Sequence, residues 1–461
     1  MVISTVGAAF MSSLDLFVVN VAFDDIGRDL GVATDGGPTA ADLSWVLSAY
    51  AVTFAALLVP FGRLADRYGH QRMFVAGLAV FVSASAMCAL SGDVWMLVAF
   101  RVLQAAGAAA MTPTSLGILM AALPPERRVA AVRLWAATGA LAAAFGPTVG
   151  GVLTQVSWHW VFLINLPIGA VLLWLAVTAV QDVHSGGDAE RPDLLGAVLF
   201  AGSVGLLALG LTKSNDWGWG SGRTIGALAG AVVLSAVFAL QSRRHTSPII
   251  HPALLRVRSF RWANLAMLTF NIAFAAQLLA GILWLQQIWG YSALRTGFAI
   301  AVGPALVPVT AALSHRLLPA VPPARLVAAG SVVCALGNLW LVWRMGAEPA
   351  YVTEYLPGWL LGGIGVGLAL PNLMAAGTRD LAPDQTATGS AIVTMSRQIG
   401  FVIGISVLFA IIGSDQGLAA REGFVATWWF SGGVLLVATL VSPGMSVRSR
   451  LTDQGSERVI R

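Results

Sequence analysis

The sequence predicts an all-α integral membrane protein with about fourteen transmembrane helices. Of its 461 residues, 57% are hydrophobic and only 11% are charged, whereas ordinary soluble domains carry about 25% charged residues. A soluble fold of this length could not keep so much apolar side chain away from water. In a bilayer the backbone must satisfy its own hydrogen bonds, which favours helices over isolated strands.

The apolar runs are long enough to be counted as individual spans. About 20 residues of helix cross the hydrocarbon core, and the runs 194–212 and 224–242 carry no charge at all. Short polar gaps separate the runs from one another. The predicted spans are 2–23, 43–62, 73–91, 94–119, 134–156, 160–180, 194–212, 224–242, 262–288, 296–314, 326–343, 355–378, 386–412 and 424–443.

The basic residues are distributed unevenly over the gaps between spans. With the N-terminus inside the cell, nineteen basic residues lie in cytoplasmic gaps and the tail, against six in outer gaps. Basic residues accumulate on the cytoplasmic side of membrane proteins. We therefore expect a multi-pass protein of the plasma or inner membrane, with both termini in the cytoplasm. The chain begins directly in an apolar stretch without a basic segment, so no cleavable signal peptide is expected.

The remaining composition argues against several other classes of protein. The net charge is +5, but the basic residues are dispersed, so no nucleic-acid partner is expected. Cys88 and Cys334 each lie within an apolar run, and two cysteines so far apart in sequence predict neither a disulfide framework nor a metal site. No nucleophile elbow, phosphate-binding loop or metal-ligand spacing occurs. We therefore expect no enzyme activity, no cofactor and no metal.

Three charged side chains interrupt the predicted spans, namely Asp15, Arg101 and Arg397. A charge inside the bilayer costs about 2.5–3.5 kcal/mol on insertion scales, and such residues are usually functional. Asp15 lies nine residues before Asp24 at the outer end of its span, or roughly 14 Å deep. Arg101 lies eight residues after Asp93, or roughly 12 Å deep. We expect Asp15 and Arg101 to pair across a shared cavity.

This pairing suggests a mechanism of proton coupling. A buried carboxylate resists ionisation, while a nearby arginine favours it. Movement of one helix relative to another would then change the proton affinity of Asp15, as a proton-coupled carrier requires. The alternative is that Asp15 is a structural hydrogen-bonding residue. Candidate cavity residues, which could also simply bridge helices, are Asn20, Gln104, Gln277 and Arg397.

A glycine- and proline-rich segment lies in the fifth predicted span. Its residues include Gly146, Pro147, Gly150 and Gly151. Proline bends a helix, and glycine allows a neighbouring helix to approach closely. A bent and closely packed helix suits a gate or a seal.

Five motifs, in order along the chain, resemble the major facilitator superfamily and specifically its fourteen-helix drug:proton antiporter branch. The strongest is the segment GRLADRYGHQR at 62–72 between the second and third spans, similar to the family's loop signature G-x-L-A-D-R-x-G-R-K-x-x. The residues that match or lie within it are Gly62, Asp66, Arg67, Gly69 and Arg72. His70 and Gln71 stand where the family has basic residues, which weakens the charge cluster.

The other four motifs lie in the first, fourth, fifth and sixth spans. Residues 14–22 resemble the branch's first-helix signature, and residues 158–169 resemble W-R-W-I-F-x-I-N-x-P-x-G with His159 for arginine. Residues 101–107 are similar to R-x-x-Q-G-x-G, whose arginine is implicated in proton coupling in relatives. Residues 146–151 resemble the G-P-x-x-G-G motif that is associated with exporters.

The resemblance implies the major facilitator fold, with two six-helix bundles and an inserted helix pair. The implied divisions are 1–181, the inserted pair and linker at 182–256, the second bundle at 257–445, and a cytoplasmic tail at 446–461. A substrate would bind between the bundles near the membrane midplane, and rocking would alternate access. The resemblance further implies a monomeric exporter of small hydrophobic or cationic compounds in exchange for protons.

Two other readings of the sequence stay open. One is a facilitator or importer of another small solute on the same fold. The other is a membrane-embedded transferase, with Asp24 and Asp25 as ligands for a metal-bound diphosphate. Such chemistry usually requires several converging carboxylates, and no second acidic pair lies near a span.

Overall fold

The computed structural model describes residues 1–32, 37–179, 193–246, 248–381, 385–413 and 417–446. Over these residues the regular structure is helical throughout. Thirteen of the helical segments described are long and apolar enough to cross a membrane. The helix α6 (Pro125–Val156) adds the shorter apolar segment Leu141–Val156. The predicted all-α membrane fold is therefore confirmed.

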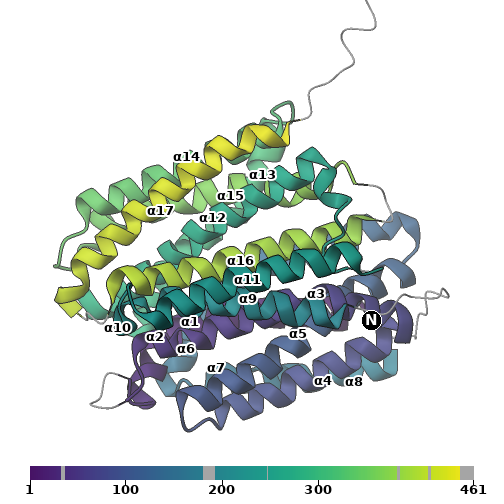
Figure 1. Ribbon diagram of the computed structural model, residues 1–461, viewed down its shortest axis with the longest axis horizontal. Helices are drawn as coiled ribbons and strands as arrows, with labels where there is room; N and C mark the ends of the chain where they lie inside the picture. Colours follow the sequence, from purple (N-terminus) through teal and green to yellow (C-terminus); the bar gives the residue numbers. More distant parts are fainter. Residues whose placement is uncertain (33–36, 180–192, 247, 382–384, 414–416, 447–461) are drawn as a thin grey trace, which may run out of the picture.

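The first group of helices packs around α1 and α5. Its members are α1 (Val2–Asp29), α2 (Ala40–Leu43), α3 (Trp45–Tyr68), α4 (His70–Ala89), α5 (Val94–Ala122), α6, α7 (Trp160–Leu163) and α8 (Asn165–Ala179). Helix α1 packs against α6, α5 and α8, and α5 also packs against α3 and α4. In Figure 1 this group is purple to blue and forms the lower half of the molecule.

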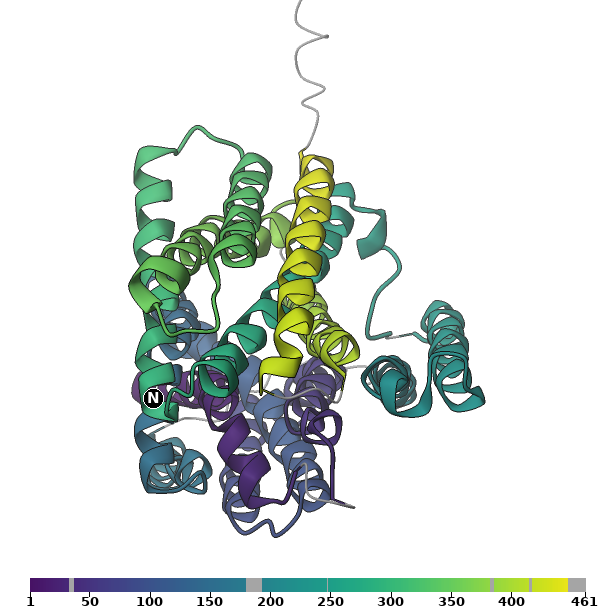
Figure 2. The same cartoon turned by 90° about the vertical axis from the view of Figure 1, so that its left-hand side faces the viewer.

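The next helices form a pair beside the first group. They are α9 (Leu194–Thr212), the short α10 (Ser214–Trp217) and α11 (Gly222–Arg244). Helix α9 packs against α11, α3 and α16, and Figure 2 shows the pair in teal to one side of the remaining helices. Only 11% of the residues in the most apolar stretch of α11 are buried. An apolar helix so exposed is suited to face lipid.

The last helices form a second packed group, drawn teal to yellow in the upper part of Figure 1. Its members are η1 (Leu254–Arg256), α12 (Arg258–Leu283), η2 (Trp284–Ile288), α13 (Ala293–Leu317), α14 (Pro323–Arg344), η3 (Tyr351–Tyr355), α15 (Leu356–Thr378), α16 (Thr386–Ile412), η5 (Gly417–Ala420), α17 (Arg421–Val441) and η6 (Ser442–Met445). Helix α12 packs against α16, α17 and α15, while α14 packs against α15 and α17. The exact residues at which the predicted divisions fall stay a prediction.

The two groups meet along two helix pairs, α6 with α13 and α3 with α16. At the end that carries α2 and α10, here called the α10 end, an apolar cluster joins both groups. This cluster includes Val19 and Phe23 of α1, Leu285 of η2, and Leu408 and Phe409 of α16. The rings of Phe23 and Phe409 lie 5.8 Å apart. The cluster closes the α10 end between the two groups.

The segment predicted as a loop between the second and third spans is mostly helical, so that expectation was wrong. Residues 62–68 form the last turns of α3, and α4 begins at His70. Only Gly69 interrupts the helices, with a φ of 101° that residues with a side chain rarely adopt. No residue between Gly62 and Tyr68 breaks a helix, so α3 continues to the single glycine that permits the turn.

Candidate functional site

The site is centred on an ion pair between two helices of the first group. Asp15 lies near the middle of α1, and Arg101 is the eighth residue of α5. The Nη1 of Arg101 donates a hydrogen bond to Oδ2 of Asp15, and neither side chain is exposed. The structure therefore brings together the two interior charges that the sequence placed at similar depth.

Three neutral side chains complete a polar network around Asp15. Gln104 Nε2 donates to Asp15 Oδ1 over 2.9 Å and to Ser85 Oγ over 2.7 Å. Asn165 Nδ2 lies 3.2 Å from the same Asp15 oxygen and 3.3 Å from Ser85 Oγ. Both carboxylate oxygens thus accept hydrogen bonds, a condition for keeping a charged carboxylate buried.

The guanidinium of Arg101 is held by further contacts. Its Nε donates to the carbonyl oxygen of Val46 over 3.1 Å, and its Nη1 donates to Gln104 Oε1 over 2.6 Å. Its central carbon lies 4.2 Å from the ring centre of Tyr50 and 5.8 Å from that of Phe162. Aromatic faces attract a cation most strongly where water is excluded. Within the described residues, Arg101 Nη2 has no hydrogen-bond partner.

The expectation that this pair lines a shared cavity does not hold in this conformation. The rings of Tyr50 and Phe162 cover Arg101, and both charged side chains are fully enclosed. Asp15 itself is surrounded by Gln104 and other polar side chains rather than by open space. Any exchange of a proton with water therefore requires a different arrangement of the helices.

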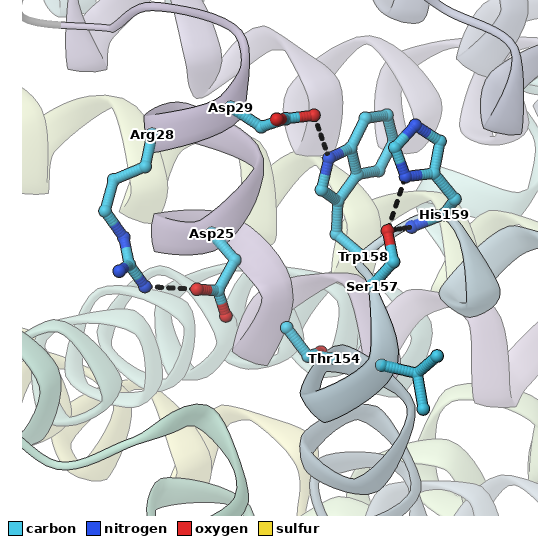
Figure 3. A pocket seen from close by; sticks show the side chains of 8 residues that line it. Asp25, Arg28, Asp29, Thr154, Ser157, Trp158 and His159 are labelled. Atoms are coloured by element: carbon cyan, nitrogen blue, oxygen red, sulfur yellow. Dashed lines mark hydrogen bonds and ion pairs between the residues drawn. The ribbon is translucent and has the colours of Figure 1, made fainter.

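An open hollow lies instead at the α10 end, between the end of α1 and the α6–α7 junction. It holds about 390 Å³, and Figure 3 shows the side chains that line it. Trp158 Nε1 donates to Asp29 Oδ2 over 2.7 Å, and Asp25 pairs with Arg28. Because Arg28 also contacts Asp24 over 3.3 Å, the acidic pair considered for a transferase is bound by an arginine of its own helix.

The glycines of the motif at 146–151 lie at two helix contacts. A Cβ at Gly150 would lie 2.8 Å from the carbonyl oxygen of Val18, and one at Gly146 would lie 2.5 Å from Phe17 Cβ, both on α1. A Cβ at Gly151 would lie 2.6 Å from the carbonyl oxygen of Ala293 on α13. One stretch of α6 thus packs closely against its own group and against the other group.

Pro147 takes part in the same contact from the α6 side. The carbonyl oxygen of Pro147 would clash with a Cβ at Gly297 of α13. Pro147 lies inside α6, and α6 continues through it. Glycines on both helices therefore allow the two groups to approach backbone to backbone at this level.

The motif at 62–72 holds the opposite end of the first group. His70 Nε2 lies 3.2 Å from Asp66 Oδ1 across the α3–α4 turn. Arg63 donates to the carbonyl oxygen of Pro248 over 3.2 Å, which ties α3 to the segment after the inserted pair. Arg67 lies 5.6 Å from the ring centre of Tyr68. Of the other residues predicted in this motif, Gly62 lies in α3, Gly69 lies between α3 and α4, and Arg72 lies in the first turn of α4.

The remaining candidate cavity residues do not join the network at Asp15. Asn20 Nδ2 donates to the carbonyl oxygen of Leu16 in its own helix over 2.6 Å. Gln277 Oε1 accepts from Asn338 Nδ2 over 3.0 Å, inside the second group. Arg397 lies on α16 and is half-buried. Of the four predicted residues, only Gln104 contacts Asp15.

A polar contact that the sequence did not predict joins both groups at the α10 end. Lys213, which follows α9, lies 2.8 Å from Asp42 and 2.9 Å from Asp216, and it donates to Thr39 over 3.0 Å. Burial lowers the pKa of Lys213, but hydrogen bonds and attraction from the two aspartates outweigh it and raise that pKa above its ordinary value. Asn215 donates to the carbonyl oxygen of Ala410 on α16 over 2.7 Å.

The sequence held one signal for this contact, because Lys213 is the only lysine in the chain. Ser85 was also missed, since a serine in an apolar helix usually bonds only to its own backbone. The inserted pair thus contacts the first group through Lys213 and the second group through Asn215.

Comparison with known proteins decides the family. Residues 5–405 match the Major Facilitator Superfamily. The chain belongs to this superfamily. A member of the superfamily with this fold is a transporter and not an enzyme. The chain is 34% identical to the cephamycin export protein CmcT of Amycolatopsis lactamdurans, over 97% of this chain and 92% of that protein.

Other relatives in the superfamily are named for drug or antibiotic export. The chain is 32% identical to the multidrug resistance protein Stp of Mycobacterium tuberculosis, over 87% of this chain and 74% of that protein. It is 31% identical to a tetracenomycin C resistance and export protein of Streptomyces glaucescens, over 88% of this chain and 74% of that protein. The predicted family is confirmed, and these relatives support an efflux transporter.

The fold is similar to that of solved transporters of low sequence identity. A crystal structure of an auto-inhibited POT family peptide transporter aligns with a TM-score of 0.69 over 98% of both chains, at 15% identity. At this identity the similarity describes the fold alone.

Proposed function

We propose that this transporter exports small organic compounds across the cell membrane in exchange for protons, with Asp15 as the residue that binds the proton. The observation that carries the proposal is the enclosed network of Asp15 with Arg101, Gln104 and Asn165. Intramembrane carboxylates are costly and are usually functional. The network holds the carboxylate of Asp15 and separates it from solvent in this conformation.

The proton would exchange in a second conformation. In that conformation, α1 shifts relative to α5 within the first group as the two groups rock, and the region around Asp15 opens to water. A proton on Asp15 removes its attraction for Arg101, so protonation favours an arrangement in which the pair is separated. Coupling of this kind requires only that the two conformations differ in proton affinity.

The closed α10 end supports an alternating-access cycle. The apolar cluster around Phe23 and Phe409, and the contact of Gly151 with α13, hold the two groups together at that end. The bias of basic residues toward the opposite side favours a cytoplasmic location for both termini. On this orientation the α10 end faces outward, and the structure corresponds to a state closed to the outside. The transporter works as a monomer.

The direction of transport rests on the relatives and on the motif at 146–151. Stp and CmcT are named for multidrug resistance and for cephamycin export. The resemblance to the antiporter branch extends the class of compounds to hydrophobic or cationic molecules.

Transport into and out of proteoliposomes tests the proposal. Purified protein would be reconstituted with a fluorescent dye inside, and dye movement would be measured with and without an imposed proton gradient. We expect dye movement to follow the gradient and internal pH to change in step with it. Dye movement at the same rate without a gradient would reject proton exchange, and movement only down the dye gradient would favour a facilitator.

A further inference from the structure

Arg397 is an interior charge without a partner. It is the twelfth residue of α16, whose bounds are Thr386–Ile412, so it lies near the middle of a spanning helix. It is half-buried. Among the described residues, none forms a hydrogen bond, an ion pair or a cation–π contact with Arg397. The two other interior charges, Asp15 and Arg101, compensate each other.

The face of α16 that carries Arg397 is defined by its neighbours. Phe401, one turn further along the same face, packs against the apolar cluster that closes the α10 end, and Ile405 belongs to that cluster. Gly400 and Gly404, three and seven residues further on, lie on the flank of this face that packs against α12. A Cβ at these positions would lie 2.5 Å and 2.3 Å from the carbonyl oxygens of Leu268 and Ile272. Arg397 therefore lies about one helical turn from the closed cluster, on the side away from the α10 end.

The opposite face of α16 is occupied by other helices. Met395 and Val402 belong to a different apolar cluster, which also contains Val52 and Ala55 of α3 and Phe200 of α9. Arg397 is not part of that cluster. Its face lies between α12 on one side and the closed cluster, which contains residues of α1, on the other. It therefore borders the region where the two helix groups meet.

The charge of the interior selects the chemistry of a ligand. With Asp15 and Arg101 paired, Arg397 leaves one net positive charge between the helix groups. A cationic compound is repelled there, and an uncharged compound leaves the guanidinium uncompensated in a medium of low dielectric constant. A carboxylate matches the planar guanidinium through two parallel hydrogen bonds.

We propose that Arg397 binds the carboxylate of an anionic organic substrate, which rests on the proposed export function and replaces its expected cationic class. A lipid phosphate is the other source of an anion. Arg397 lies eleven residues from the start of α16 at Thr386, or roughly 16 Å of helix from that end. Lipid headgroups lie at the membrane surface, so this depth favours a soluble carboxylate that enters between the bundles.

Binding of a matched pair of probes tests the proposal without any proton gradient. The probes are 7-methoxycoumarin-3-carboxylate and its uncharged carboxamide, which have similar size and fluorescence. Affinity would be measured by fluorescence anisotropy on purified protein in nanodiscs of zwitterionic lipid. We expect the wild type to bind the carboxylate about tenfold more tightly, since a hydrogen bond to a charged group contributes about that factor.

Two substitutions at Arg397 and one control complete the test. Arg397→Gln should remove the preference for the carboxylate, and Arg397→Lys should retain part of it. Arg295→Gln is the control, because Arg295 stacks 3.7 Å from the ring centre of Tyr291 near the start of α13. It should leave the preference unchanged.

The outcomes separate this proposal from proton coupling. Equal binding of both probes by the wild type, or binding of neither, overturns the assignment of Arg397. An unchanged preference in folded Arg397→Gln protein also overturns it. If the preference for the carboxylate disappears when anionic lipid is added to the nanodiscs, the occupant of the site is a lipid phosphate instead. Asp15→Asn should keep the preference, so a failure of proton exchange leaves the result at Arg397 intact.

Discussion

Arg101 of α5 donates a hydrogen bond to Asp15 of α1 although the two residues are 86 positions apart, and both side chains are fully enclosed. Separating the members of a buried ion pair is costly, because each charge then lacks compensation. The pair is consequently a natural point at which protonation and helix movement can influence each other.

Replacing Asp15 by asparagine should abolish proton-linked transport while the protein still folds. Asparagine has nearly the same shape, and its side-chain oxygen can accept from Gln104. We expect gradient-driven efflux in proteoliposomes to fall at least tenfold, a difference of about 1.4 kcal/mol. Asp24→Asn is the matched control, because Asp24 lies on the same helix, is partly exposed and pairs with Arg28. Wild-type dependence on the proton gradient in Asp15→Asn would remove Asp15 from the mechanism.

Replacing Arg101 by alanine should destabilise the protein more than removing both charges. Breaking a buried pair on one side costs about 3–5 kcal/mol, because the other charge is left uncompensated. The double variant Asp15→Asn with Arg101→Ala should therefore regain part of the stability that Arg101→Ala loses. Thermal unfolding of the wild type, both single variants and the double variant measures the coupling. If the stability lost in the double variant equals the sum of the losses in the two single variants, the ion pair contributes little to stability.

Replacing Gly151 by valine should block closure of the α10 end. A Cβ at this position would lie 2.6 Å from the carbonyl oxygen of Ala293, which is closer than real contacts allow. We expect transport to fall about tenfold or more, with the protein held open at that end. Gly139→Val is the control on the same helix, since no atom of the described side chains or backbone lies within 4 Å of its Cβ position. Equal activity of the two variants would contradict a role for the α6–α13 contact.

Chemical modification of Lys213 can report opening of the α10 end, because Lys213 is the only lysine in the chain. An amine-reactive reagent that modifies lysine can report on one side chain, located by mass spectrometry of its peptide. We expect slow modification in the wild type, where Lys213 is 12% exposed and bound to Asp42. Modification should be faster in Gly151→Val and unchanged in Gly139→Val. The reverse order would show that Lys213 does not follow opening.

The ion pairs of Lys213 also predict a dependence of stability on pH. Its pKa is raised in the folded protein, so its contribution is fully present below the unfolded value of about 10.4 and is lost as pH rises through the raised pKa. We expect Lys213→Met to lower the free energy of unfolding by about 1 kcal/mol near pH 8. The difference in the free energy of unfolding between the wild type and Lys213→Met should shrink above about pH 10.4. A difference that grew with pH would contradict this assignment.

Much of the fold could be predicted because membrane helices are encoded locally. Each predicted span overlaps a described helix, from α1 at the start to α17 at the end, although the span at 160–180 is divided between α7 and α8. The prediction failed at 62–68, where charged residues suggested a loop although they continue α3. Charge alone does not end a helix that projects from the membrane, and only Gly69 provides the required backbone conformation.

The candidate site could be predicted only in part. Depth along a helix follows from residue count, so Asp15 and Arg101 could be placed at one level. Depth does not give the direction of a side chain, so the contacts of Ser85 and the enclosure by Tyr50 were missed. Asn20 was expected near the cavity, yet its amide bonds to Leu16 of its own helix.

By itself, the sequence determined that this chain crosses a membrane many times, and which three charges lie at depth, because hydrophobicity and helix length act within each segment. The tertiary structure alone decided which of those charges meet. Arg101 reaches Asp15 because α5 packs beside α1, whereas Arg397 lies on α16 in the other helix group without a described partner. The physical reason is that pairing depends on how distant helices rotate and pack, and no local pattern specifies that rotation.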